Sequence, residues 1–278
     1  MINNKVCVKI NCYKGFTYEE TLNGIKNAGF RYLELSTSNG NSLGLSQNMP
    51  FNELWKIKED IESRGLIPLA IGGNSYIMDD DTSKIVSNIY LAKFFNCKYV
   101  DTTMFNARND SESQTSDEEI INHIRYYIPY LEEYNLTLVI ELHGKYASGK
   151  ILNNILKQIN NKHVQINYDT GNALYCAGLE VEEMLKDLEE NIDDVSFMHL
   201  KDKLDAKNVW NFPALGKGYI PFIDIFTILK NHNNNSPLTV EIEFTEKGVS
   251  DVSEVDNALI DSANLFKSLN INLLHLWS

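Results

Sequence analysis

Short apolar stretches of strand length alternate along this chain with longer stretches of helical periodicity. The first strand-like stretch spans residues 5–10, and the first helical one spans 18–28 and ends at Gly29, a typical helix-terminating residue. The complete pattern predicts strands at residues 5–10, 32–35, 66–71, 98–103, 136–141, 164–168, 195–200 and 238–244, and helices at 18–28, 51–64, 79–95, 117–134 (with a kink or break at Pro129), 150–160, 181–190, 222–230 and 252–269. Such alternation favours parallel strands with helices outside them.

Eight strand–helix units in 278 residues suit an α/β fold of the (β/α)8 TIM barrel type. An open, doubly wound sheet is the rival, but it usually carries a glycine-rich phosphate turn after its first strand. Here that strand is followed by Asn11-Cys12-Tyr13-Lys14-Gly15. We therefore expect a single TIM-barrel domain over residues 1–278. The apolar segment 271–277 is expected to cover the barrel floor or to meet another subunit of a homo-oligomer.

The charge of the chain bears on its partners. It has 25 Lys and Arg against 38 Asp and Glu, a net charge of −13, which disfavours nucleic acid as a ligand. Its four cysteines form no CxxC pair and are typical of reduced thiols. The sequence contains neither a signal-peptide-like block at its start nor an apolar stretch long enough for a bilayer. We expect a cytoplasmic protein with a small-molecule partner and no membrane.

Ionisable residues end the strands of the second half. Glu141, Asp169 and His199 each end a strand, and the last strand carries both Glu241 and Glu243. The carboxyl ends of barrel strands form one rim, where the active sites of this fold lie. Carboxylates crowded there would repel one another, and a divalent cation removes that conflict. One imidazole among oxygen ligands suits Mn²⁺, Mg²⁺ or Co²⁺, and zinc also fits.

Each residue also has a purely structural interpretation. Asp169 could cap a helix at Thr170, and His199 could be a hydrogen-bonded core residue. Their joint placement at matching strand ends favours a site. The choice between Glu241 and Glu243 stays open because side chains two apart share one face of a strand.

Four motifs at these strand ends, taken in order, are characteristic. They are IELHG at residues 140–144, YDTGN at 168–172, MHLKD at 198–202 and TVEIE at 239–243, with a turn LGKG at 215–218 before a helix. Together they resemble the motifs of the sugar phosphate isomerase/epimerase family, which are xylose isomerase-like TIM barrels distantly related to endonuclease IV. The resemblance covers nearly the whole chain.

The resemblance implies one divalent metal ion, with Mn²⁺ favoured, held by Glu141, Asp169, His199 and Glu241. It also implies that Glu141 and Glu241 act as acid and base in proton abstraction next to a carbonyl, through an enediolate. It implies as well that His143, Asn172 and Lys201 contact substrate hydroxyls. Each has an equally good structural interpretation: His143 could support a metal ligand, Asn172 could cap a helix, and Lys201 could be a charge at the rim of the barrel.

The sequence departs from the ketose epimerases of this family in two places. They tend to have a histidine where this chain has Asn172, and an arginine after the seventh strand, where residues 203–210 contain none. This favours a keto-sugar, keto-glycoside or inosose-like cyclitol as substrate, and no clear phosphate-binding turn is visible. Trp210 and Phe212 could stack on a sugar ring, although packing is slightly favoured.

Three other functions have been found or can be imagined on such a barrel, and the sequence favours two of them less. A dehydratase would begin with the same proton abstraction. A nuclease of the endonuclease IV type would need a multi-metal cluster with more histidines than the 6 in this chain provide at strand ends. A sugar-binding barrel without catalysis would not need two glutamates on one cation.

Overall fold

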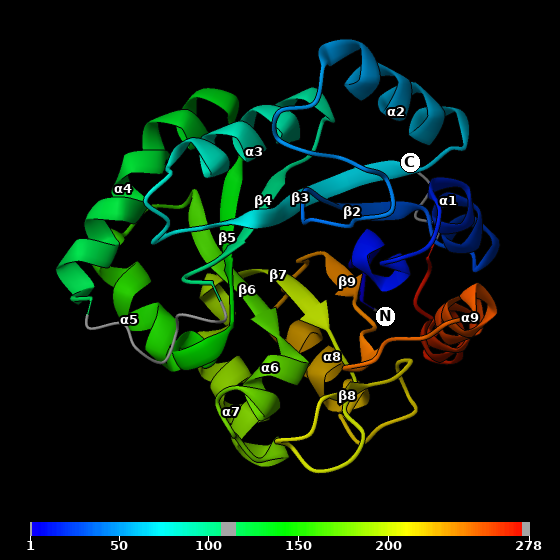
Figure 1. Ribbon diagram of the computed structural model, residues 1–278. Coiled ribbons are helices and arrows are strands. Elements are labelled where there is room, and N and C mark those ends of the chain that lie inside the picture. Colours follow the sequence, from blue (N-terminus) through cyan, green and yellow to red (C-terminus); the bar gives the residue numbers. More distant parts are fainter. Residues whose placement is uncertain (1, 107–114, 274–278) are drawn as a thin grey trace.

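Eight parallel strands close into a barrel in the computed structural model, which describes residues 2–106 and 115–273. Their order around the barrel is β1-β2-β3-β4-β5-β6-β7-β9, and β9 closes the circle on β1. Figure 1 shows the strands at the centre with the helices outside them. The bounds are β1 Val6–Lys9, β2 Tyr32–Ser36, β3 Ile67–Tyr76, β4 Tyr99–Thr103, β5 Thr137–Glu141, β6 Val164–Asp169, β7 Val195–Leu200 and β9 Leu238–Val240. The predicted (β/α)8 TIM barrel is confirmed.

The helices between the strands pack apolar faces against the barrel. In α5, for example, Leu152, Ile155 and Leu156 are buried on one face, as expected for an amphipathic helix. The bounds are α1 Tyr18–Asn27, α2 Phe51–Ser63, α3 Ser83–Phe94, α4 Asp117–Tyr134, α5 Gly149–Ile159, α6 Thr170–Tyr175, α7 Val181–Asn191, α8 Phe222–Asn231 and α9 Val252–Ser268, with 3-10 turns at η1 Ile10–Tyr13, η2 Gly144–Tyr146 and η3 Ile192–Asp194.

The barrel interior has an apolar layer beneath a charged one. Tyr99 and Phe197 pack against Ala70 and Val139, with the Tyr99 and Phe197 rings 5.2 Å apart. Side chains two residues further along a strand point to the same side. The next residues on that side are therefore charged or polar: Asp101 after Tyr99, Glu141 after Val139 and His199 after Phe197. The apolar layer thus closes the floor of the charged one.

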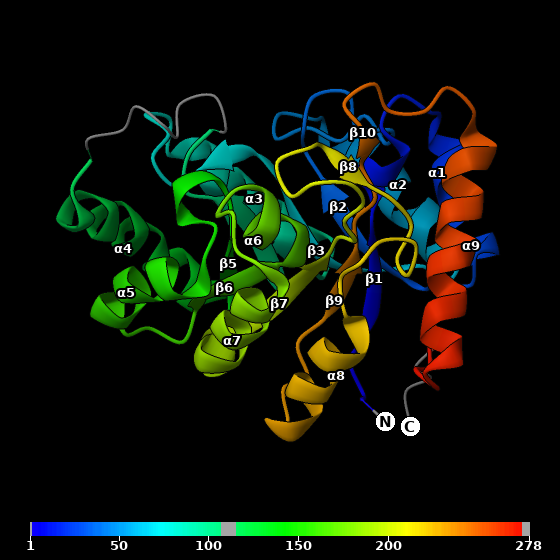
Figure 2. The same cartoon turned by 90° about the horizontal axis from the view of Figure 1, so that it is seen from below.

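The last barrel strand is shorter than predicted. Residues 238–244 were expected to be one strand, but β9 ends at Val240. Phe244 has a left-handed backbone with φ +54°, which regular strands do not use. Phe244–Thr245 (β10) instead pairs antiparallel with Asn211–Phe212 (β8). Figure 2 shows this short pair above the barrel, at the carboxyl ends of the strands. We call this end of the barrel the mouth.

Other predicted boundaries also shift. The third strand continues to Tyr76 rather than ending at residue 71, and helix α3 begins at Ser83 rather than at 79. Helix α4 runs without a break through Pro129. The short helix α6, directly after β6, was not predicted.

The apolar segment near the end of the sequence is only partly described. Ile271 and Leu273 are buried. Leu274, Leu276 and Trp277 lie outside the described residues, so the proposed role of this segment at the barrel floor or in an oligomer stays a prediction. None of the described helices combines the length and apolarity needed to cross a lipid bilayer.

Candidate metal centre

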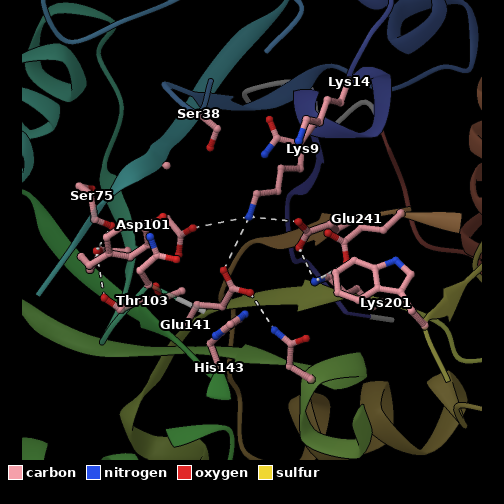
Figure 3. Close-up of a pocket in the computed structure, with 18 residues that line it drawn as sticks. Lys9, Lys14, Ser38, Ser75, Asp101, Thr103, Glu141, His143, Lys201 and Glu241 are labelled. Carbon is pink, nitrogen blue, oxygen red and sulfur yellow. Dashed lines mark hydrogen bonds and ion pairs between the residues drawn. The ribbon is translucent and has the colours of Figure 1, made fainter. Parts of the chain in front are cut away.

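A cavity of about 400 Å³ opens at the mouth of the barrel, among the loops that follow the strands. Figure 3 shows charged side chains from several strands pointing into it. Lys9 comes from β1, Asp101 from β4 and Glu141 from β5, while Lys201 follows β7 and Glu241 follows β9. The strand order therefore brings together groups that are far apart in the sequence.

Glu141, Asp169, His199 and Glu241 meet at the base of the mouth, and Glu141 and Glu241 also line the cavity. Each offers one ligand atom, and these four atoms all lie within 4.8 Å of one another. The Nδ1 atom of His199 is 3.1 Å from Glu241 Oε2, 3.5 Å from Glu141 Oε2 and 3.8 Å from Asp169 Oδ2. All four side chains are buried. Together they could hold a metal ion.

The bonding of these carboxylates fits that use. Asp169 Oδ1 accepts the backbone N–H of Asn172 at 2.8 Å and so caps α6, while Asp169 Oδ2 has no hydrogen-bond partner among the described residues. The same holds for Glu241 Oε2. Lys201 Nζ is 3.2 Å from the first of these oxygens and 3.4 Å from the second, which compensates their charge. Asp169 can therefore serve as a helix cap and still offer an oxygen to a cation.

A buried glutamate on β2 orients the imidazole. His199 Nε2 lies 2.9 Å from Glu34 Oε2, and neither side chain is exposed. A carboxylate can only accept, so Nε2 carries the hydrogen and donates it to Glu34. Burial would raise the pKa of Glu34, but His199 and Lys9 lower it below its usual range. A carboxylate behind a ligating histidine is a recurrent arrangement in metal sites.

We expect Glu34→Gln to weaken Mn²⁺ binding by about 10-fold to 100-fold, because the neutral amide no longer stabilises or orients His199 as the carboxylate does. Isothermal titration of Mn²⁺ into the metal-free protein measures this. Glu62→Gln, on the exposed side of α2, is the matched control and should bind as the wild type does. An unchanged affinity in Glu34→Gln would contradict the assigned role.

Two lysines supply positive charge inside the cavity. Lys9 Nζ lies 3.2 Å from Glu241 Oε1, 3.3 Å from Glu34 Oε1, 3.6 Å from Asp101 Oδ2 and 3.8 Å from Glu141 Oε2. Lys201 Nζ lies 3.0 Å from Glu243 Oε2, besides its contacts with Asp169 and Glu241. Burial opposes the charge of both lysines, but the surrounding carboxylates raise each pKa well above its ordinary value.

The carboxyl groups fall into two electrostatic classes. Burial raises the pKa of Asp169 to about 7, although Lys201 opposes the rise, and burial raises that of Asp101 to about 7 as well. Burial also acts on Glu141 and Glu241. Lys9 and His199, however, hold the pKa of Glu141 well below its usual range. Lys201 and Lys9 likewise hold the pKa of Glu241 below its usual range. Glu141 and Glu241 are therefore ionised at neutral pH.

The three residues expected near a substrate all line the cavity: His143, Asn172 and Lys201. Asn172 Nδ2 donates to Glu141 Oε1 at 3.0 Å and to the Leu142 carbonyl at 2.9 Å. Asn172 thus holds Glu141 in place from α6. Glu243 lines the cavity too, but its side chain is 28% exposed against 5% for Glu241, and only Glu241 belongs to the group of four ligand atoms that lie together.

The aromatic residues of the loop after β7 differ in their surroundings. Phe212 is fully buried and packs edge-on against Tyr175 and Trp210, with ring centroids 5.7 and 5.3 Å away. Trp210 also contacts Tyr175 but lines the cavity. Phe212 is therefore a packing residue, whereas Trp210 both packs and lines the cavity.

A buried aspartate holds that loop over the cavity. Asp202 accepts four backbone N–H groups, from Lys203 at 2.7 Å, Gly216 and Gly218 at 2.8 Å, and Ile220 at 3.2 Å. Gly218 approaches so closely that a Cβ there would collide with the Lys203 carbonyl and the Asp202 carboxylate. The glycine turn at residues 215–218 thus serves to bring backbone donors to Asp202.

Sequence reasoning missed Lys9, Glu34 and Asp101. Each is a charged residue within a strand whose other members are mostly buried. A charge in such a strand requires a partner, because a buried, unpaired charge is costly. That signal was present in the sequence, but it does not identify the partner.

Residues 22–268 match the model of a family described as xylose isomerase-like TIM barrel. No curated protein matches the chain by sequence.

Similar solved structures cover nearly the whole chain. A D-psicose 3-epimerase in the presence of D-fructose has a TM-score of 0.73 at 11% identity, covering 96% of this chain and 99% of that one. A 3-keto-D-glucoside 4-epimerase from E. coli has 0.69 at 17% identity, covering 95% and 99%. The IOLI protein with a binding zinc atom has 0.70 at 16% identity, covering 99% and 100%. At these identities the likeness concerns the fold.

Proposed function

Because the chain belongs to the xylose isomerase-like TIM barrel family, we propose that it is a divalent-metal-dependent isomerase or epimerase. Its substrate is a keto-sugar, keto-glycoside or cyclitol. The observation that carries the proposal is the convergence of Glu141, Asp169, His199 and Glu241, two of which, Glu141 and Glu241, line the cavity. Similar structures include epimerases of psicose and of a 3-keto-glucoside, which agrees with a carbonyl-bearing carbohydrate.

Glu141, Asp169, His199 and Glu241 would hold the metal ion. Three carboxylates with one imidazole favour Mn²⁺ over zinc, the metal of one similar structure. A bound divalent ion supplies Lewis-acid polarisation of a substrate carbonyl and of its neighbouring hydroxyl. This makes the adjacent C–H group more acidic.

The chain itself supplies the proton transfers. Figure 3 shows Glu141 and Glu241 on two sides of the Lys9 ammonium, both reaching the cavity. One of these glutamates removes the proton next to the carbonyl, and the other returns a proton to the opposite face of the carbon, which inverts it. The low pKa of both keeps the glutamate that removes the proton ionised, and the other can return a proton only after taking one up. Lys201, His143 and Asn172 line the cavity and would contact substrate hydroxyls.

The test is a substrate screen in deuterated water. Keto-sugars, 3-keto-glycosides and inososes are incubated with the Mn²⁺-loaded protein, and carbon-bound deuterium is followed by NMR and mass spectrometry. We expect one compound class to gain a single deuterium next to its carbonyl and to yield an epimer or isomer. Loss of water from the product would identify the dehydratase instead. Metal binding without exchange in any class would contradict the proposal.

A further inference from the structure

A lysine lies where a second metal ion would fit. We propose that the Lys9 ammonium replaces a second cation in the mouth of the barrel and so restricts the site to one metal ion. The inference rests on the proposed function only in requiring that the site binds a divalent metal. It concerns how many ions bind and why.

His199 stands between two groups of carboxylates. Its Nδ1 side faces the proposed metal ligands Glu141 and Glu241. Its Nε2 side faces Glu34, and ligand atoms of Glu34, Asp101 and His199 also lie within 4.8 Å of one another. Asn167 adds a buried polar group there, because its Nδ2 donates to Asp101 Oδ1 at 2.8 Å and its Oδ1 has no hydrogen-bond partner among the described residues. Glu34, Asp101 and Asn167 Oδ1 thus offer the oxygen ligands that a divalent ion needs, while His199 Nε2 keeps the hydrogen that it donates to Glu34.

Lys9 already contributes the positive charge of that second group. Its Nζ lies 3.3 Å from Glu34 Oε1 and 3.6 Å from Asp101 Oδ2, and its side chain is only 10% exposed. A divalent ion bound to the same carboxylates at about 2.0–2.6 Å would face the ammonium across a shared oxygen. Two cations so close repel strongly in a buried site. The second group has no free imidazole nitrogen to offset this repulsion, because His199 Nε2 is bonded to Glu34, whereas His199 Nδ1 faces the first group. The ammonium and a second ion therefore exclude one another.

The charges around the mouth show why removing Lys9 would matter. Six carboxyl groups meet there, those of Glu34, Asp101, Glu141, Asp169, Glu241 and Glu243, against the two ammonium groups of Lys9 and Lys201. Lys9 contacts four of the six. Without it, Glu34 and Asp101 lose their cationic lysine partner, and a second divalent ion becomes the natural replacement.

The mouth would then hold two positive charges of different kinds: an exchangeable metal ion and the Lys9 ammonium, which is covalently part of the chain. Lys9 also lines the cavity, so its ammonium faces the substrate space whether or not the metal ion is bound. A two-metal site would instead make both positive charges depend on metal supply.

Counting bound Mn²⁺ in the intact protein tests this. Native mass spectrometry and metal analysis after dialysis should give one ion in the wild type and two in Lys9→Met or Lys9→Gln. Lys14→Met is the matched control, because Lys14 is an exposed lysine of the same cavity and should keep one ion. The double variant Lys9→Met/Asp101→Asn, which removes a ligand of the second group, should return to one.

Electron paramagnetic resonance supplies a second readout, and its measurement on the wild type needs no variant. Wild type in millimolar Mn²⁺ should show only uncoupled Mn²⁺, whereas Lys9→Met should show a coupled pair. One ion in both Lys9 variants, or a coupled pair in the wild type, overturns the inference and leaves the proposed function intact. A wild type that binds no ion contradicts the proposed function itself, so the two failures are distinguished.

Discussion

Glu141→Gln and Glu241→Gln are each expected to lower kcat by about 10²-fold to 10⁴-fold on the substrate found by the screen. The glutamine side chain keeps an oxygen that can bind a cation. It can neither take up nor return a proton. The effect should fall on kcat more than on KM, since the lost interaction belongs to the proton-transfer step. Asn172 donates to Glu141 in the present arrangement and can still donate to a glutamine oxygen, so the geometry should persist.

Steady-state kinetics and single-turnover deuterium exchange measure this effect, with Mn²⁺ content determined for every sample. Glu246→Gln is the matched control, because Glu246 is exposed beyond β10 and should leave turnover unchanged. Full turnover in both variants at wild-type metal content would show that the acid and base have been assigned wrongly. Loss of bound metal with the activity would point to metal holding rather than proton transfer.

Asp202→Ala is expected to lower the free energy of unfolding by at least about 3 kcal/mol, since each buried donor left without an acceptor costs roughly 1–3 kcal/mol. The substitution removes the acceptor of four backbone N–H groups in the loop after β7. Alanine cannot accept any of them. Because Trp210 belongs to this loop, activity should fall as well.

Urea denaturation followed by circular dichroism measures the loss. Asp193→Ala, at an exposed position of η3, is the control and should change the free energy of unfolding by less than about 0.5 kcal/mol. If the free energy of unfolding of Asp202→Ala were within about 1 kcal/mol of the wild-type value, water would have replaced the carboxylate as acceptor in the loop.

The barrel could be predicted from sequence because its pattern is local. The periodicity of about a dozen residues is enough to indicate each strand or helix, and the alternation of the two predicts parallel strands. The end of the last strand could not be predicted, because residues 238–244 alternate between apolar and polar side chains as a strand would. The left-handed backbone at Phe244 accompanies its pairing with Phe212, a residue far earlier in the chain.

The site divides in the same way. Glu141, Asp169, His199 and Glu241 stand at strand ends, where the fold itself predicts that they meet. Lys9 and Glu34 could not be assigned because their partners are distant: Glu34 and His199 are 165 positions apart and come together only when the barrel closes. Which of two glutamates faces the cluster was likewise decided by burial, which the sequence does not contain.

The antiparallel pair of β8 and β10 bears on attempts to transplant this pocket. Asn211–Phe212 and Phe244–Thr245 join the loop that carries Trp210 to the segment that carries Glu241 and Glu243. A chimera that receives one loop without the other would lose this ladder and leave its backbone donors and acceptors to water. Both segments must therefore be transferred together if a designed barrel is to have the same substrate specificity.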